Sequence, residues 1–245
     1  MEKRIWAKID GLQLHHLVPG GPDRAAWASL KLGSAFNING IMISSKPEEE
    51  WQFTSNPGNA DARLLDVPGL HEKLTKGELL RDVLYKAVHD LCLDRSEVLR
   101  PFIKNGWPGD ELTFGFFKPK DWQGKSLMIP VDFISLQDFQ LVEKTGVVTA
   151  DIEVGHHLVF WHVKIYDPEQ VWDPLACGFS DAPFGEERIQ HEEIARLING
   201  MLLMDGNVKK TISAVAEGKI DMESKFIDKV EGCDPEATPP PIKFE

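Results

Sequence analysis

Hydrophobic and polar residues alternate along the first part of the chain, and this period of two predicts β-strands. The alternation runs through residues 5–9 and again through residues 12–18, with Asp10-Gly11 between them. An Asp-Gly pair suits the positive φ angles of a two-residue turn, so the pattern predicts a β-hairpin. A second hairpin is predicted around Asn39-Gly40. Between the two, Asp23 stands where it can cap a short helix that ends near Lys31.

From Thr75 the apolar period changes to about 3.6 residues, which is typical of an α-helix. Thr75 and Glu78 have the spacing of a capping box, and the apolar residues from Leu80 to Leu91 form one stripe. A second, shorter helix is predicted over about 96–104, because the Gly and Pro that follow it cannot continue a helix.

The middle of the chain, about residues 111–166, returns to a period of two with short connections. This pattern predicts an antiparallel meander. Three helical stripes follow, over about 185–204, 208–216 and 222–230. The Pro-rich residues after Cys233 predict an extended polyproline II tail outside the packed core.

Together these elements predict an α+β fold. We expect an antiparallel β-meander or sandwich-like sheet with N-terminal hairpins, a central helical pair, and three C-terminal helices packed on one face. Residues 1–232 are expected to form a single domain, and residues 233–245 its tail. Within the domain the blocks are 1–66 (hairpin-rich), 67–107 (helical), 108–182 (meander) and 183–232 (helical).

Composition narrows the classes of function. The 245 residues carry a net charge of -12, which argues against a nucleic-acid surface, since such surfaces cluster Lys and Arg. No apolar run approaches the roughly 18 residues of a membrane span, and the first residues lack the pattern of a secretory signal. Three widely spaced cysteines favour a reducing compartment. We therefore expect a cytoplasmic protein, or a virion component if the source is viral.

His89-Asp90 is the first candidate for chemistry. The pair resembles the His-Asp pair of metal-dependent phosphohydrolases, whose metal site needs a further His and Asp from other helices. Helical phase argues against a metal site here, because His89 shares a face with Asp82 and Lys86, opposite the apolar stripe.

The remaining histidines offer a second candidate site. His156 and His162 point to the same side of a predicted strand, while His157 points to the other. A metal site would need a distant strand to complete it, so histidines satisfied within the core or at an edge are the simpler interpretation. Phosphate-loop, zinc-protease and serine-nucleophile motifs are absent from the sequence, and we predict no cofactor.

Seven tryptophans accompany only two tyrosines, and several of the tryptophans fall in turns. Such indoles either close the end of a sheet core or anchor a partner at the surface, and the first role is the commoner. The candidate contact residues in turns and in the tail are Trp107, Trp122, Trp172, Pro239, Pro240, Pro241 and Phe244.

Two classes of function remain open. We favour a non-catalytic interaction or assembly protein, a subunit of a larger homo- or hetero-oligomeric particle such as a viral or phage structural component. Its partners would be other protein subunits, and a homo-oligomer is expected. The alternative is a small-molecule enzyme with an aromatic-lined pocket, in which His156, His162 and His89 with Asp90 serve as acid, base or metal ligands.

Overall fold

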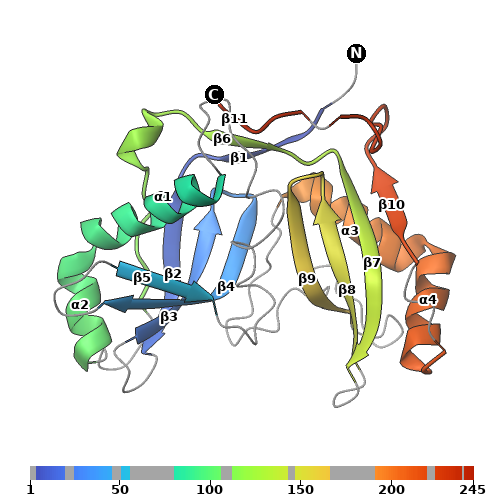
Figure 1. Ribbon diagram of the computed structural model, residues 1–245, viewed down its shortest axis with the longest axis horizontal. Coiled ribbons are helices and arrows are strands. Elements are labelled where there is room, and N and C mark those ends of the chain that lie inside the picture. Colours follow the sequence, from blue (N-terminus) through green and yellow to red (C-terminus); the bar gives the residue numbers. More distant parts are fainter. Residues whose placement is uncertain are drawn as a thin grey trace.

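The computed structural model describes residues 4–19, 25–45, 51–55, 80–105, 112–142, 147–165, 191–219, 224–238 and 240–245. These residues form three antiparallel sheets and four α-helices, which confirms the α+β class. Figure 1 shows two four-stranded sheets side by side, each with a pair of helices, and a three-stranded sheet that runs across the top of both. None of the helices in the described ranges is long and apolar enough to cross a membrane.

The first four-stranded sheet has the order β2-β3-β4-β5, and its helices are α1 and α2. Its elements are β2 (Leu12–Pro19), β3 (Ala25–Leu32), β4 (Phe36–Ser45), β5 (Trp51–Ser55), α1 (Leu80–Asp94) and α2 (Ser96–Asn105). The second has the order β10-β7-β8-β9, and α3 and α4 pack on it. Its elements are β7 (Phe133–Val142), β8 (Val147–Val154), β9 (Leu158–Ile165), α3 (Glu192–Met204), α4 (Gly206–Ala216) and β10 (Phe226–Lys229).

The three-stranded sheet joins segments that lie far apart in the sequence. Its order is β1 (Trp6–Ile9), β6 (Leu127–Pro130) and β11 (Lys243–Phe244), and both pairs are antiparallel. A short 3-10 helix, η3 (Lys120–Trp122), precedes β6. Because β1 and β6 lead into different four-stranded sheets, their pairing ties the two halves of the molecule together (Figure 1).

The two halves of the chain repeat one arrangement. In each, a four-residue strand of the top sheet is followed by a meander of strands and then by two helices. A final strand then returns to the outer edge of the meander. We call this segment the return strand: residues 112–117, bonded to β2 in the first half, and β10, bonded to β7 in the second. We name the halves unit 1 (residues 4–117) and unit 2 (residues 126–229).

Irregularities of the backbone recur at one spacing, 122 positions. His16 (φ 50°) in unit 1 corresponds to Asp138 (φ 54°) in unit 2. The register of the first strand pair shifts between positions 15 and 18 in unit 1 and between 137 and 140 in unit 2. The next pair shifts between 28 and 30, and between 150 and 152. Bulges are specific local features, so their coincidence establishes the repeat more firmly than the order of elements does.

Two glycines hold equivalent turns against the top sheet. Gly33 has φ 56° and Gly155 has φ 58°, a conformation that favours glycine. The Gly33 N–H donates to the Gly11 carbonyl at 2.9 Å, and the Gly155 N–H donates to the Phe133 carbonyl, again 122 positions on, at 2.8 Å. A Cβ atom would lie 2.6 Å from the Lys8 carbonyl oxygen at Gly33, and 2.5 Å from that of Pro130 at Gly155. Both turns therefore require glycine for the same two reasons.

The repeat is almost invisible in the sequence. When residues 4–19 and 25–43 are aligned with 126–141 and 147–165, only five of the 35 positions are identical. These are Asp10 with Asp132, Leu14 with Leu136, Ala28 with Ala150, Gly33 with Gly155, and Ile43 with Ile165. The glycine pair occupies the two turns, the aspartate pair lies just after β1 and β6, and the other three are buried apolar pairs.

The hairpin predicted at Asp10-Gly11 is wrong. β1 and β2 do not pair with each other, since β1 pairs with β6 and β2 pairs with β3. Gly11 is needed for a close approach instead of a turn: a Cβ atom there would lie 2.4 Å from the Phe117 carbonyl oxygen. The dipeptide therefore carries the chain from one sheet into the next.

Two further predictions for unit 1 are wrong. The segment expected as a helix ending near Lys31 is the strand β3, because it is bonded to strands on both sides and this pairing outweighs local capping. Asn39-Gly40 is not a turn, since β4 runs through it. The predicted helices over 80–91 and 96–104 are confirmed as α1 and α2, while the Thr75 capping box lies outside the described residues.

In unit 2 the strands β7, β8 and β9 confirm the meander, although β6 belongs to the top sheet. Two of the three predicted C-terminal helices are present, as α3 and α4. The third is wrong: residues 226–229 form β10, in which Phe226 and Asp228 are partly buried while Ile227 and Lys229 are exposed. This alternation has the period of two that is typical of a strand. The hydrogen bonds to β7 favour the strand over the predicted helix.

The tail is extended but does not lie outside the core, which corrects that part of the prediction. Ile242 is 1% exposed and belongs to the hydrophobic core, and β11 pairs with β6. The Glu245 N–H donates to the Ser126 carbonyl at 3.0 Å, and the ammonium group of Lys243 lies 4.6 Å from the centre of the Trp6 ring. The described part of the tail is therefore held by its own chain.

We predict that Gly33→Ala and Gly155→Ala each lower the free energy of unfolding by about 2–4 kcal/mol, because each introduces a left-handed non-glycine residue and a backbone clash. Urea denaturation measures the loss. Gly115→Ala is the control, since a Cβ atom there meets nothing within 4 Å. Similar losses in both turns are expected from the repeat, and a loss at one turn alone would contradict their equivalence.

Candidate functional site

The side chains considered for an enzyme lie on different elements. His89 and Asp90 are neighbours on α1, each about one-third exposed, with 3.8 Å between His89 Nδ1 and Asp90 Oδ1. His156 lies in the turn between β8 and β9 of unit 2, where its ring packs edge-on against Phe133 with 4.7 Å between the ring centres. His162 lies in β9, and its side chain is outside the description. Among the described residues no three His, Cys, Asp or Glu side chains gather as a metal site would require.

Two other histidines have structural partners. His15 is buried, and its Nε2 lies 2.8 Å from Asn37 Oδ1. His157 is 1% exposed, and its Nε2 lies 3.1 Å from the Pro240 carbonyl oxygen. Because a carbonyl only accepts, Nε2 of His157 carries the hydrogen. This bond attaches the tail to the turn between β8 and β9.

Trp122 and Phe244 pack on each other. Trp122 is 4% exposed, and the two ring centres lie 5.7 Å apart in an edge-to-face arrangement. Trp122 therefore closes an end of the core, as the commoner role of turn tryptophans predicts. Pro240 accepts the bond from His157, and Pro241 is exposed. The other candidate contact residues, Trp107, Trp172 and Pro239, lie outside the described residues.

The described cysteines are buried thiols. Cys92 on α1 and Cys233 are both free. Burial raises the pKa of the Cys92 thiol well above its ordinary value, so it stays protonated and is a poor nucleophile.

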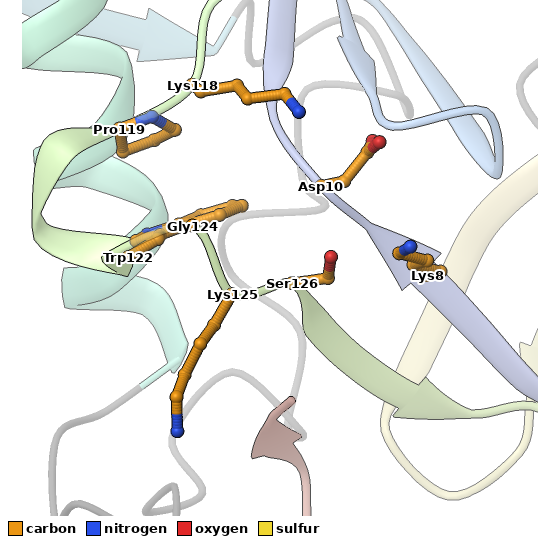
Figure 2. Close-up of a pocket in the computed structure, with 8 residues that line it drawn as sticks. All are labelled: Lys8, Asp10, Lys118, Pro119, Trp122, Gly124, Lys125 and Ser126. Carbon is orange, nitrogen blue, oxygen red and sulfur yellow. The ribbon is translucent and has the colours of Figure 1, made fainter.

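The described part of the chain contains a small pocket where unit 1 meets η3 and β6. Its volume is about 100 Å³, and its polar lining is Lys8, Asp10, Lys118, Lys125 and Ser126. Pro119 and Trp122 supply an apolar wall. In Figure 2, Lys118 reaches across the pocket toward Asp10, Ser126 lies between Lys125 and Lys8, and the Lys125 side chain points away. We call this the Asp10 pocket.

The repeat gives the Asp10 pocket a counterpart in unit 2. Asp132 corresponds to Asp10, and its carboxylate is closed off by the start of the chain. Arg4 donates to Asp132 Oδ2 at 2.7 Å, and the Ile5 N–H donates to Asp132 Oδ1 at 2.6 Å. The Asp132 side chain is 4% exposed. Thus a cationic group and a backbone donor fill the unit 2 site.

In the Asp10 pocket, no arginine stands at the position equivalent to Arg4. The position 122 residues after Arg4 is Ser126, whose short hydroxyl cannot replace a guanidinium. Asp10 is only partly buried, and within the described residues its carboxylate has no hydrogen bond or ion pair. The pocket is therefore the space left by an arginine-to-serine difference between two equivalent sites.

Sequence reasoning missed this pocket, although one signal was present. Residues 118–125 contain three lysines in a chain with a net charge of -12. Lys8 and Asp10 come from β1 and its exit, more than 100 positions earlier, and only the pairing of β1 with β6 places them beside this segment.

Large exposed apolar side chains occur at corresponding places in the two units. On the return strands, Phe116 is 43% exposed and Ile227 is 47% exposed. The bridges of residues 12 with 117 and 17 with 112 place Phe116 opposite Gln13, and β10 places Ile227 opposite Ser135, the counterpart of Gln13. Each return strand thus presents an apolar side chain at the same position.

Comparisons with protein-family models, with curated proteins and with solved structures gave no match for this chain.

We predict that Asp132→Ala and Asp10→Ala differ sharply in their effect on stability. Asp132→Ala removes the partners of Arg4 and of the Ile5 N–H and should lower the free energy of unfolding by about 2–4 kcal/mol. Asp10→Ala should change it by less than about 0.5 kcal/mol, because Asp10 has no such partners among the described residues. Urea denaturation of both variants measures the difference, and equal losses would contradict the different roles of the two carboxylates.

Proposed function

We propose that the protein is a non-catalytic interaction or assembly protein that binds further copies of itself through the return strands of its two units. The observation that carries the proposal is the exposed apolar residue, Phe116 or Ile227, at the same position of both return strands.

Each return strand lies at an outer edge of the described sheet. β10 is the terminal strand in the order β10-β7-β8-β9. Residues 112–117 lie outside β2, which ends the other sheet. An edge strand offers unpaired N–H and C=O groups to a further strand, and an exposed apolar side chain adds burial to that pairing. Edge-to-edge pairing between copies would use both the backbone groups and the apolar side chain of the return strand.

Two equivalent edges make the protein bivalent. If each edge pairs with the matching edge of another copy, a single contact gives a dimer, and both contacts together extend the assembly beyond a dimer. The net charge of -12 opposes close approach of copies, so association should strengthen as salt screens this repulsion. A subunit of a larger particle would have these properties.

The tail contributes differently from an intersubunit arm. Its described contacts are with Trp122, His157 and β6 of the same chain. The proposal therefore rests on the return strands, and the tail supports it only by stabilising the subunit.

We predict that the wild-type protein associates beyond a dimer at high protein and salt concentration. Phe116→Lys or Ile227→Lys alone should stop association at the dimer, because a charged lysine blocks one edge. The double variant should be monomeric. Sedimentation velocity and native mass spectrometry distinguish these states.

Met204→Lys is the matched control. It makes the same kind of change at a position that is 84% exposed, at the end of α3 instead of a sheet edge. Circular dichroism and thermal unfolding establish that each variant is folded. A wild-type protein that stays monomeric at all concentrations, or a Met204→Lys variant as impaired as the edge variants, would refute the proposal.

A further inference from the structure

We propose that the Asp10 pocket binds a small zwitterion of the α-amino acid class, with its ammonium group on Asp10 and its carboxylate on Lys118 and Lys8. The inference does not require the assembly proposed above, because the residues that line the pocket belong to neither return strand, although Lys118 directly follows residues 112–117.

The unit 2 site shows what a carboxylate in this position binds. Asp132 accepts from a cationic group, the Arg4 guanidinium, and from an N–H group, that of Ile5. Asp10 stands in the equivalent place, and Ser126 leaves the position of the guanidinium open. A ligand that supplies a cationic nitrogen donor would restore the missing interaction.

The lysines that line the pocket favour a ligand with a negative group close to its cationic nitrogen. Lys118 reaches toward Asp10 in Figure 2, and Lys8 lines the same cavity. A purely cationic ligand would meet these ammonium groups, and a purely anionic ligand would meet the Asp10 carboxylate. A ligand whose ammonium and carboxylate groups are attached to the same carbon pairs with both kinds of side chain, and the Ser126 hydroxyl can donate to its carboxylate.

The size of the pocket limits the ligand further. A volume of about 100 Å³ is well below that of pockets for drug-sized molecules or cofactors, which are about 300–1,000 Å³. Glycine or a similarly small amino acid suits this space, with Pro119 and Trp122 against its apolar part.

The test is an NMR titration of the full chain with glycine, acetate and methylammonium as separate probes. Glycine should cause saturable shifts of the amide signals near residues 8–10 and 124–126. Acetate and methylammonium should bind at least tenfold more weakly, since each carries one of the two charges. Asp10→Asn and Lys118→Gln should each weaken glycine binding at least tenfold.

Lys120→Gln is the matched control, because Lys120 is an exposed lysine of η3 that does not line the pocket. It should leave glycine binding unchanged. Acetate binding as tight as glycine and tightened by Asp10→Asn would identify a simple anion site and overturn the proposal. Methylammonium binding tightened by Lys118→Gln would identify a cation site and overturn it too, as would the absence of saturable shifts with glycine.

Discussion

The pairing of β1 with β6 is the contact on which the rest of the molecule depends. Each strand begins one unit, so their four paired positions join the two units directly. The turns at Gly33 and Gly155 then pack against the carbonyl groups of this pair or its flank, and β11 adds the tail to the free side of β6. A single hydrophobic core includes residues of β1, β6 and both four-stranded sheets, and Phe244 of β11 packs against it, so the units are stabilised together.

The two units keep their backbone and differ in how they use it. The Asp132 carboxylate accepts hydrogen bonds from Arg4 and from the Ile5 N–H, whereas Asp10 lies in a pocket that three lysines also line. Gly11 leaves room for the Phe116 ring, while its counterpart Phe133 lies opposite Lys229 and packs on His156. The pocket proposal derives from this difference between equivalent positions, whereas the assembly proposal derives from a feature that both units share, the exposed apolar residue of the return strand.

The histidines illustrate why burial and partners decide the role of a residue type. His15 and His157 are inside the protein and each has a polar partner, Asn37 and the Pro240 carbonyl. His89 and His156 lie on different elements, and their described neighbours are Asp90 and Phe133. The enzyme alternative needs these side chains to converge, and the structure gives it no additional support. The described part of the tail contacts its own chain.

Sequence alone determined the α+β class, the helices α1 and α2, and the meander of β7 to β9, because these depend on local periodicity. It could not determine the pairing of strands that lie far apart in the sequence. Asp10-Gly11 and Asn39-Gly40 look like turns, and residues 226–229 look helical, until long-range hydrogen bonds assign them to sheets. The repeat and the Asp10 pocket were also beyond reach, since five identities in 35 positions carry little signal. Only tertiary pairing brings Asp10 beside Ser126, because a sheet joins residues by register and not by their distance along the chain.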